Sequence, residues 1–184
     1  MVGTSIVRMA LTGSDRRLLG SAVVFVVSQV NIARVLGATA PTVGTIQTTF
    51  SAAKYRKILD NLEPEDLRRY RRHYYWDMVH PLTFAVALRA GARALADRRP
   101  LSPGTRRTLA VAPAIAAAGD YVENIAGLYL LDHRDRIDDT TVRAASTISV
   151  TKWVLALGCF AYLSQGFLRV WTGAGLRRLR GEKG

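Results

Sequence analysis

Two short runs of the sequence carry groups that could exchange protons inside an apolar environment. Asp120, Glu123 and Asn124 stand three and four residues apart, so they share one face of a helix. Asp77 and His80 are also three residues apart and share a face in the same way. Carboxylates held close together at low dielectric constant tend to share a proton. The pattern therefore predicts an acid/base site, with these five side chains as the candidate catalytic residues.

Each candidate has an expected role in this hypothesis. Asp120 and Glu123 would be the acid and the base, and Asp77 with His80 would set their protonation. Asn124 would orient the substrate. A second set of polar and aromatic residues would bind that substrate: Asn31, Arg34, Trp76, Tyr121 and Lys152.

Four apolar stretches must position these groups. They cover about 18–40, 74–96, 108–131 and 145–171, and Arg residues concentrate between them. At about 1.5 Å per residue, each stretch can cross the roughly 30 Å hydrocarbon layer of a bilayer. Core helices of a soluble protein would need charged outer faces, but Thr108 to Gly119 has no charge at all. The sequence thus predicts a single-domain (1–184), all-α polytopic membrane protein, a bundle of four transmembrane helices.

The polar groups inside these stretches fall at similar depths. Counted from the helix ends next to 42–73 and 132–144, they lie about 9 to 16 Å deep at helical rise. Arg34, Lys152 and Glu123 come from three different stretches, yet all fall in the same half of the bilayer. Charged groups in a bilayer cost several kcal/mol unless they are paired or hydrated. We therefore expect them to meet in one polar pocket.

The segments between the stretches also make structural predictions. Phe50, Ile58 and Leu62 recur at roughly helical spacing among cations, which indicates a short amphipathic helix at the membrane interface between the first and second spans. Pro81 inside the second stretch predicts a kink. His73 is expected to be solvated at the interface, and the tail 172–184 to be flexible. The first stretch could be a signal peptide cleaved after Ala40, but its length and the following proline favour a retained helix.

Charge indicates the partner and the orientation. The net charge is +12, and the Arg clusters abut apolar runs without any nucleic-acid-binding motif. This favours membrane lipids over nucleic acid as partners. Fourteen Lys and Arg residues lie on the side of the two chain ends and eleven on the other, which predicts a multi-pass protein of the cell membrane with both termini in the cytoplasm. Oligomeric state is not readable.

No cofactor is expected, because nucleotide, haem and flavin motifs are absent. The single cysteine, Cys159, excludes an internal disulfide and CxxC chemistry. His73, Asp77, His80 and the two acids of the third stretch are ligand types, but their spacing matches no zinc or di-iron signature. We therefore predict no metal.

Three functions remain open from the residues alone. The pocket could do acid/base chemistry on a lipid or isoprenoid-like substrate. It could bind a hydrophobic small molecule or a lipid, or couple transport to protons. It could also serve only to fix helix packing, for example by pairing Lys152 with Glu123. Whether the protein is an enzyme stays undecided at this point.

Two motifs resemble a known group of proteins. Tyr74 to Leu82 reads YYWDMVHPL and Asp120 to Asn124 reads DYVEN. They resemble the Tyr-x-x-Asp-x-x-x-Pro and Asp-x-x-Glu-Asn pattern of small bacterial four-helix integral membrane proteins of unassigned function. The resemblance covers about residues 45–165 and implies the fold and the polar positions, but no activity. A looser likeness is to the emopamil-binding sterol isomerases, whose small helical bundles use acids, His and Asn inside the membrane.

Overall fold

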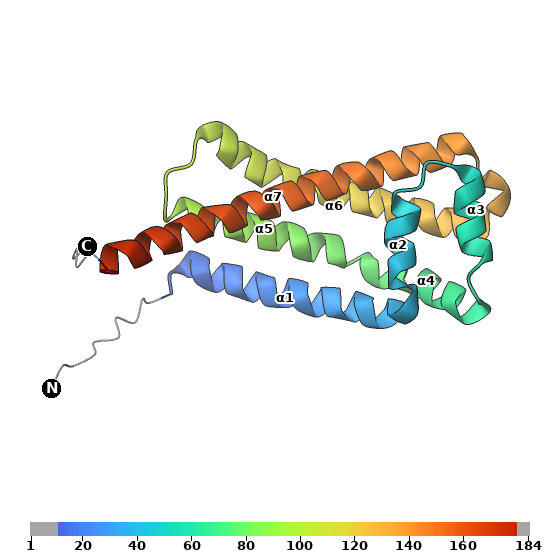
Figure 1. Ribbon diagram of the computed structural model, residues 1–184, viewed down its shortest axis with the longest axis horizontal. Coiled ribbons are helices and arrows are strands. Elements are labelled where there is room, and N and C mark those ends of the chain that lie inside the picture. The colour runs from blue at the N-terminus through green and yellow to red at the C-terminus, as the bar shows by residue number, and fades with distance from the viewer. Residues whose placement is uncertain (1–10, 180–184) are drawn as a thin grey trace.

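The described part of the chain consists of helices joined by short turns. The computed structural model describes residues 11–179, with side chains as far as residue 175. Within that range there is no strand, so the all-α prediction is confirmed. The elements shown in Figure 1 are α1 (Gly13–Leu36), η1 (Gly37–Thr39), α2 (Ala40–Gln47), α3 (Ala52–Asp60), α4 (Pro64–Asp77), α5 (His80–Ala96), α6 (Pro103–Asp132), η2 (Arg134–Arg136) and α7 (Asp139–Leu179).

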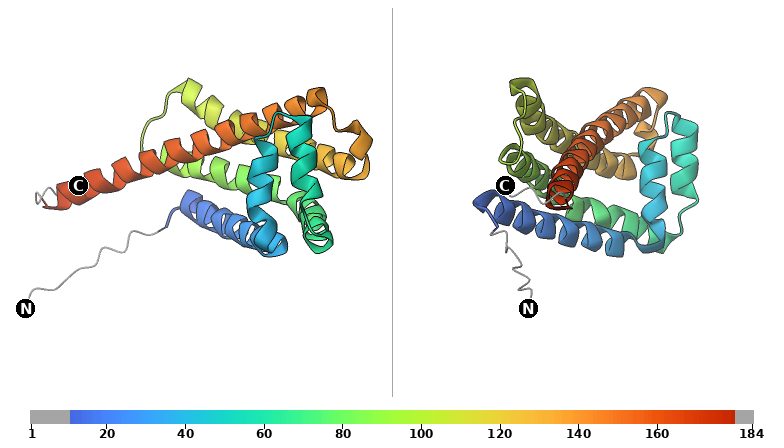
Figure 2. Two further views of the ribbon diagram at one scale, coloured as in Figure 1. Left: turned by 45° about the vertical axis from the view of Figure 1, so that its right-hand side comes forward. Right: turned by 60° about the vertical axis from the view of Figure 1, so that its left-hand side comes forward.

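The long helices lie along one axis and alternate in direction. α1 packs on α4 and α5, α5 packs on α6, and α6 packs on α7. α2 and α3 run across this axis, at the end of the molecule away from the start of α1 and the end of α7 (Figures 1 and 2). Both short helices contact α7. Along the chain they connect α1 to α4, and because they cross the bundle they also pack against α7.

Several helices begin directly after a capping residue, and a hydropathy pattern does not reveal such residues. Thr12 and Asp15 form a reciprocal capping box, so α1 begins at Gly13 and not near residue 18. The Ser102 hydroxyl caps α6 in the same way, by accepting from the Thr105 N–H at 3.1 Å. At α7 the Asp138 carboxylate accepts from the Thr141 N–H at 2.8 Å, and this hydrogen bond lowers the pKa of Asp138.

The second predicted stretch is broken where a kink was expected. α4 ends at Asp77 and α5 begins at His80, with Pro81 in its first turn. Proline has no N–H to bond the carbonyl four residues earlier, and its ring clashes with that carbonyl. The carbonyl concerned is that of Asp77. Met78 and Val79 keep α-helical backbone angles, so the stretch is interrupted at the place of the predicted kink, and Asp77 and His80 lie in separate helices.

Two further boundaries differ from the prediction. The segment 42–60 forms two helices, α2 and α3, where one was expected. α3 is amphipathic, with Tyr55 and Leu59 buried and the cations Lys54, Arg56 and Lys57 exposed, but Phe50 precedes it and is exposed. The tail is helical as far as Leu179, since no proline interrupts it. Residues 180–184 of the predicted flexible tail, and residues 1–10, lie outside the described part.

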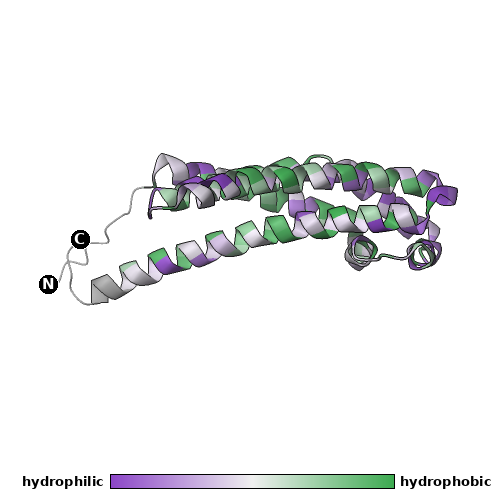
Figure 3. Cartoon of the chain, turned by 90° about the horizontal axis from the view of Figure 1, so that it is seen from above, coloured by the Kyte–Doolittle hydropathy of each residue, from purple (hydrophilic) through white to green (hydrophobic). Residues whose placement is uncertain are grey.

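The outer surface of the bundle is apolar along much of its length. Two segments, Gly13–Gln47 and Asp139–Gly175, are long and apolar enough to cross a membrane. The core helix of a soluble protein would be mostly buried, but α1 buries only Ile32, Val35 and Leu36. Five valines of α1 (Val23, Val24, Val26, Val27 and Val30) are exposed, as are Val150 and Val154 of α7. Figure 3 shows that hydrophobic residues recur along the long helices. Exposed apolar surface of this extent is typical of contact with lipid or protein.

Ion pairs hold the two ends of this apolar belt. At one end Arg98 of the α5–α6 connection pairs with Asp15 of α1. At the other end Arg71 of α4 bonds both carboxylate oxygens of Asp132, at 2.5 and 2.9 Å, and thereby lowers the pKa of Asp132. Surface pairs of this kind contribute little stability. Their positions mark the two polar ends of the molecule, with one further ionic cluster buried between them.

Candidate functional site

A buried cluster joins one lysine to two carboxylates. Lys152 of α7 forms an ion pair with Asp120 of α6 and a second one with Glu123, with Nζ 2.9 Å from Oε2. Asp120 and Glu123 lie one helical turn apart and so both face α7. All three residues are buried, at 4% to 7% relative exposure. An ionic cluster this far from water needs nearly complete pairing to be stable.

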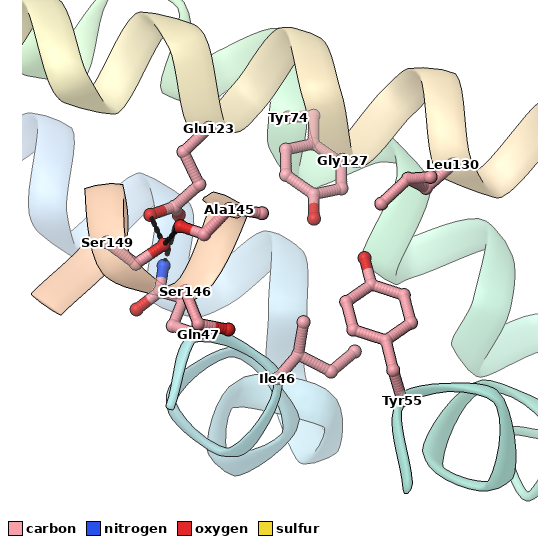
Figure 4. A pocket seen from close by; sticks show the side chains of 10 residues that line it. All are labelled: Ile46, Gln47, Tyr55, Tyr74, Glu123, Gly127, Leu130, Ala145, Ser146 and Ser149. Carbon is pink, nitrogen blue, oxygen red and sulfur yellow. Dashed lines mark hydrogen bonds between the residues drawn. The ribbon is translucent and has the colours of Figure 1, made fainter. Parts of the chain in front are cut away.

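Polar groups from two further positions complete the pairing of Glu123. Gln47, the last residue of α2, donates from Nε2 to Glu123 Oε1 at 2.5 Å. The Ser149 hydroxyl of α7 donates to the other carboxylate oxygen (Figure 4). Gln47 is itself held by the Trp153 indole N–H, which donates to its Oε1 at 2.8 Å. The Glu123 carboxylate thus connects α2, α6 and α7, and both of its oxygens have protein partners.

A small cavity lies beside Glu123. Its volume of about 20 Å³ leaves room for one or two water molecules. The lining includes Gln47, Ser146 and Ser149, which lie near the carboxylate in Figure 4, and Tyr55 and Tyr74, which lie across the cavity from it. Burial raises the pKa of Tyr55 to about 12, so this phenol stays neutral at physiological pH. An isoprenoid chain would not fit into this cavity.

Tyr74 packs against the backbone of α6 at Gly127. A Cβ on Gly127 would lie 2.3 Å from the Tyr74 oxygen and 2.4 Å from its Cζ. The Tyr74 hydroxyl is fixed by a 2.8 Å hydrogen bond to the Tyr70 hydroxyl, and the ring is buried. Only glycine allows α4 and α6 to approach this closely.

Replacing Gly127 by Ala should therefore lower the free energy of unfolding in detergent by about 1–3 kcal/mol, the usual effect of overpacking. The matched control is Gly158→Ala on α7, where an added Cβ meets nothing within 4 Å. That variant should be as stable as the parent or more stable, because Ala favours helix. Equal losses from both variants would show that the Tyr74–Gly127 contact is unimportant.

Asn124 of α6 forms a hydrogen bond at the break between α4 and α5. Its Nδ2 donates at 2.9 Å to the Asp77 carbonyl, the group that Pro81 leaves without a helical donor. Asn124 is fully buried, and its Oδ1 has no hydrogen-bond partner among the described residues. A buried acceptor without a donor is costly and needs an explanation. The amide therefore presents one free acceptor beside Asp77.

Asp77 stands at the edge of the ionic cluster. Its charge interacts with those of Asp120, Lys152 and Glu123, and it belongs to no ion pair within residues 11–179. Asp77 is half-buried, and its neighbour Trp76 is 52% exposed on the apolar surface. Asp77 is therefore the least buried of the three acidic residues of this region.

Other predicted site residues lie apart from this centre. His80 Nδ1 lies 3.0 Å from the Ser28 hydroxyl of α1, and its ring contacts Phe25 and Phe84. Arg34 and Trp76 are exposed, whereas Asn31 and Tyr121 are half-buried. His73 is buried and bonded to the Tyr70 carbonyl, so the expectation of a solvated His73 is wrong. Its imidazole ring contacts the rings of Tyr70 and Tyr74 on the same helix.

The sequence reasoning missed Gln47, Ser149 and the tyrosines of the cavity. Ser149 stands three residues before Lys152, so helical spacing could have found it. Gln47 carried no such signal, because its position depends on α2 crossing the bundle. No group of three or more metal-ligating side chains occurs in the part of the chain that the structure describes.

No protein-family model matches the chain, and no curated protein or solved structure matches it either. The resemblance to small bacterial four-helix membrane proteins therefore stays a prediction.

Proposed function

We propose that the chain is a multi-pass membrane protein whose four crossing segments are α1, the end of α4 (from about residue 74) with α5, α6, and α7, with both termini in the cytoplasm. Exposed apolar side chains on the two less hydrophobic segments support this. They include Leu82 and Val86 on α5 and Ile115 and Ile125 on α6, all more than half exposed. With the exposed valines of α1 and the outer face of α7, they form a belt around the bundle. α2 and α3 would lie at the interface, where α3 exposes Lys54, Arg56 and Lys57.

Within this membrane protein we propose a proton-exchanging site at Asp77 that does acid/base chemistry on a lipid or isoprenoid-like substrate. The observation that carries the proposal is the unpartnered Oδ1 of Asn124, a buried acceptor on the amide whose Nδ2 bonds the main-chain carbonyl of half-buried Asp77. A protonated Asp77 supplies the donor that this oxygen lacks, because the oxygen itself is closed to an outside substrate. Since Trp76 and Val79 beside Asp77 face outward, the substrate approaches from the lipid.

The ionic cluster then acts behind the site as a positioning element. Both oxygens of Glu123 are occupied by protein donors, and Asp120 is paired with Lys152. These acids are less available for proton transfer than Asp77. Two carboxylates against one ammonium leave the cluster one negative charge in excess. We therefore assign to Asp77 the role of acid or base that the sequence predicted for Asp120 and Glu123.

Solvent deuterium provides the test. Membranes from cells that make the chain are incubated in D₂O, and their lipids are compared by chromatography and mass spectrometry with membranes from cells without it. We expect one lipid species to change in retention time or to gain deuterium only when the protein is present. If every lipid species is identical in the two preparations, the acid/base proposal is wrong.

Proton-coupled transport is the second candidate. The cavity beside Glu123 favours it, because one or two water molecules there would touch the charged cluster. Liposomes containing the protein and a pH-sensitive dye distinguish the two functions. Collapse of an imposed pH gradient, with no change in the lipids, would favour transport over chemistry.

A further inference from the structure

A second polar feature lies far from Asp77, in a surface groove between the beginning of α1 and the later half of α5. The groove has a volume of about 440 Å³ and is lined by Ser14, Arg17, Val86, Arg89, Ala90 and Arg93. Three of its six lining residues are arginines, and none is acidic. Each of these arginines is exposed, and none forms an ion pair within residues 11–179. At the adjoining start of α1, Asp15 forms an ion pair with Arg98, so its charge does not compensate the arginines of the groove.

The groove is charged at one end and apolar at the other. Leu82, Val86, Arg89 and Arg93 follow each other at spacings of four, three and four residues, so they form one stripe on α5. Leu82 and Val86 are each 56% exposed. On α1, Val24 is also 56% exposed, and it lies two turns beyond Arg17 on the same face of the helix. Two adjacent helices therefore both present cations toward the chain ends and apolar side chains toward the middle of the bundle.

This arrangement matches the shape of a phospholipid. A phosphate needs several cationic donors, and arginine bonds its oxygens in a bidentate manner. The acyl chains need apolar surface directly beside the headgroup site. Basic pockets between helices at the cytoplasmic membrane surface bind anionic lipid headgroups in this way.

We propose that the groove binds the phosphate headgroup of an anionic phospholipid, with Arg17, Arg89 and Arg93 around the phosphate and Ser14 as a hydroxyl donor. The acyl chains lie along the exposed apolar side chains of α1 and α5. This site rests on the membrane placement of the bundle, and it is independent of acid/base chemistry at Asp77.

The test uses the full-length chain in a neutral detergent and measures the binding of phosphatidylglycerol and of phosphatidylcholine by native mass spectrometry. The protein should bind phosphatidylglycerol and discriminate against phosphatidylcholine. The variant Arg17→Gln with Arg89→Gln and Arg93→Gln should bind phosphatidylglycerol about 100-fold more weakly, at roughly fivefold for each cation lost.

The matched control removes the same charge from the same end of the molecule. Arg106, Arg107 and Arg169 are exposed on α6 and α7, outside the groove. Their replacement by Gln should change the affinity no more than about twofold, because exposed charges at a distance are largely screened. Circular dichroism and gel filtration establish that each variant is folded.

Three outcomes would overturn the proposal. Equal losses of phosphatidylglycerol affinity in the two triple variants would mean that the overall positive charge attracts the lipid and that the groove is not a specific site. Equal binding of the two lipids would mean that the headgroup is not recognised. Competition by inorganic phosphate at the same concentration as the lipid would mean a phosphate site without a role for acyl chains. None of these results depends on lipid conversion, so failure here leaves the proposed chemistry untouched, and the reverse is also true.

Discussion

Replacing Lys152 by Met should lower the free energy of unfolding by about 3–5 kcal/mol, the usual effect of breaking a buried ion pair from one side. Met has a similar length and fills the space of the lysine stem. What remains is a pair of carboxylates, Asp120 and Glu123, buried without a cation. The hydrogen bonds to Glu123 from Gln47 and Ser149 compensate only part of that charge. The measurement is unfolding of the purified protein in detergent with increasing dodecyl sulfate.

Two comparisons identify the cause of the loss. Lys54→Met removes an exposed cation from α3 and should change stability by less than about 0.5 kcal/mol. Adding Asp120→Asn and Glu123→Gln to Lys152→Met removes all three charges and should recover most of the lost stability. If the triple variant is no more stable than Lys152→Met, lost packing explains the effect and the cluster is not held by charge.

Replacing Asp77 by Asn should lower the rate of lipid conversion by about 10²–10⁴-fold, the range for removal of a general acid or base. The two side chains have nearly the same shape, and the Asp77 carbonyl that Asn124 bonds is part of the main chain. The fold should therefore survive. The rate is measured in D₂O from the lipid species that changes when wild-type protein is present.

The matched variant for this experiment is Asp97→Asn, at the exposed end of α5. It removes the same charge and should retain the wild-type rate. Glu123→Gln should lower the free energy of unfolding but should lower the rate of lipid conversion less than Asp77→Asn does, because Glu123 is placed behind the site. Full conversion by Asp77→Asn, together with a large loss in Glu123→Gln, would return the role of acid or base to Glu123.

Much of the cluster was predictable because helical spacing and depth are readable from sequence. Asp120, Glu123 and Lys152 were expected at similar depths on facing helices, and the structure pairs them. Long apolar runs predict helices well, since only a helix satisfies their backbone groups over such a length. The four-helix architecture itself is still a proposal, because among the described residues 11–179 two segments are long and apolar enough to cross a membrane.

The parts that failed depend on contacts between distant segments. Pro81 is compatible with a kink or with a break, and Asn124, 43 positions later, supplies the donor that makes the break acceptable. Gln47 reaches Glu123 only because α2 crosses the bundle. His73 looked solvated because it lies among arginines, but helix α4 turns it toward Tyr70 and Tyr74. Spacing along one helix cannot reveal the contacts of Asn124 and Gln47, whereas Tyr70, three residues before His73, could have been read from it.

The sidedness of the α5–α6 connection tests the four-span account most directly. In a chain with Cys159→Ala, single cysteines are placed at Asn61, Pro100, Asp135 and Thr172, all of which are exposed. Intact and permeabilised cells are then treated with a membrane-impermeant maleimide. The account predicts that Asn61→Cys and Asp135→Cys react in intact cells, and that Pro100→Cys and Thr172→Cys react only after permeabilisation. If Pro100→Cys reacts on the same side as Asn61→Cys and Asp135→Cys, only α1 and α7 cross the membrane, and the account is contradicted.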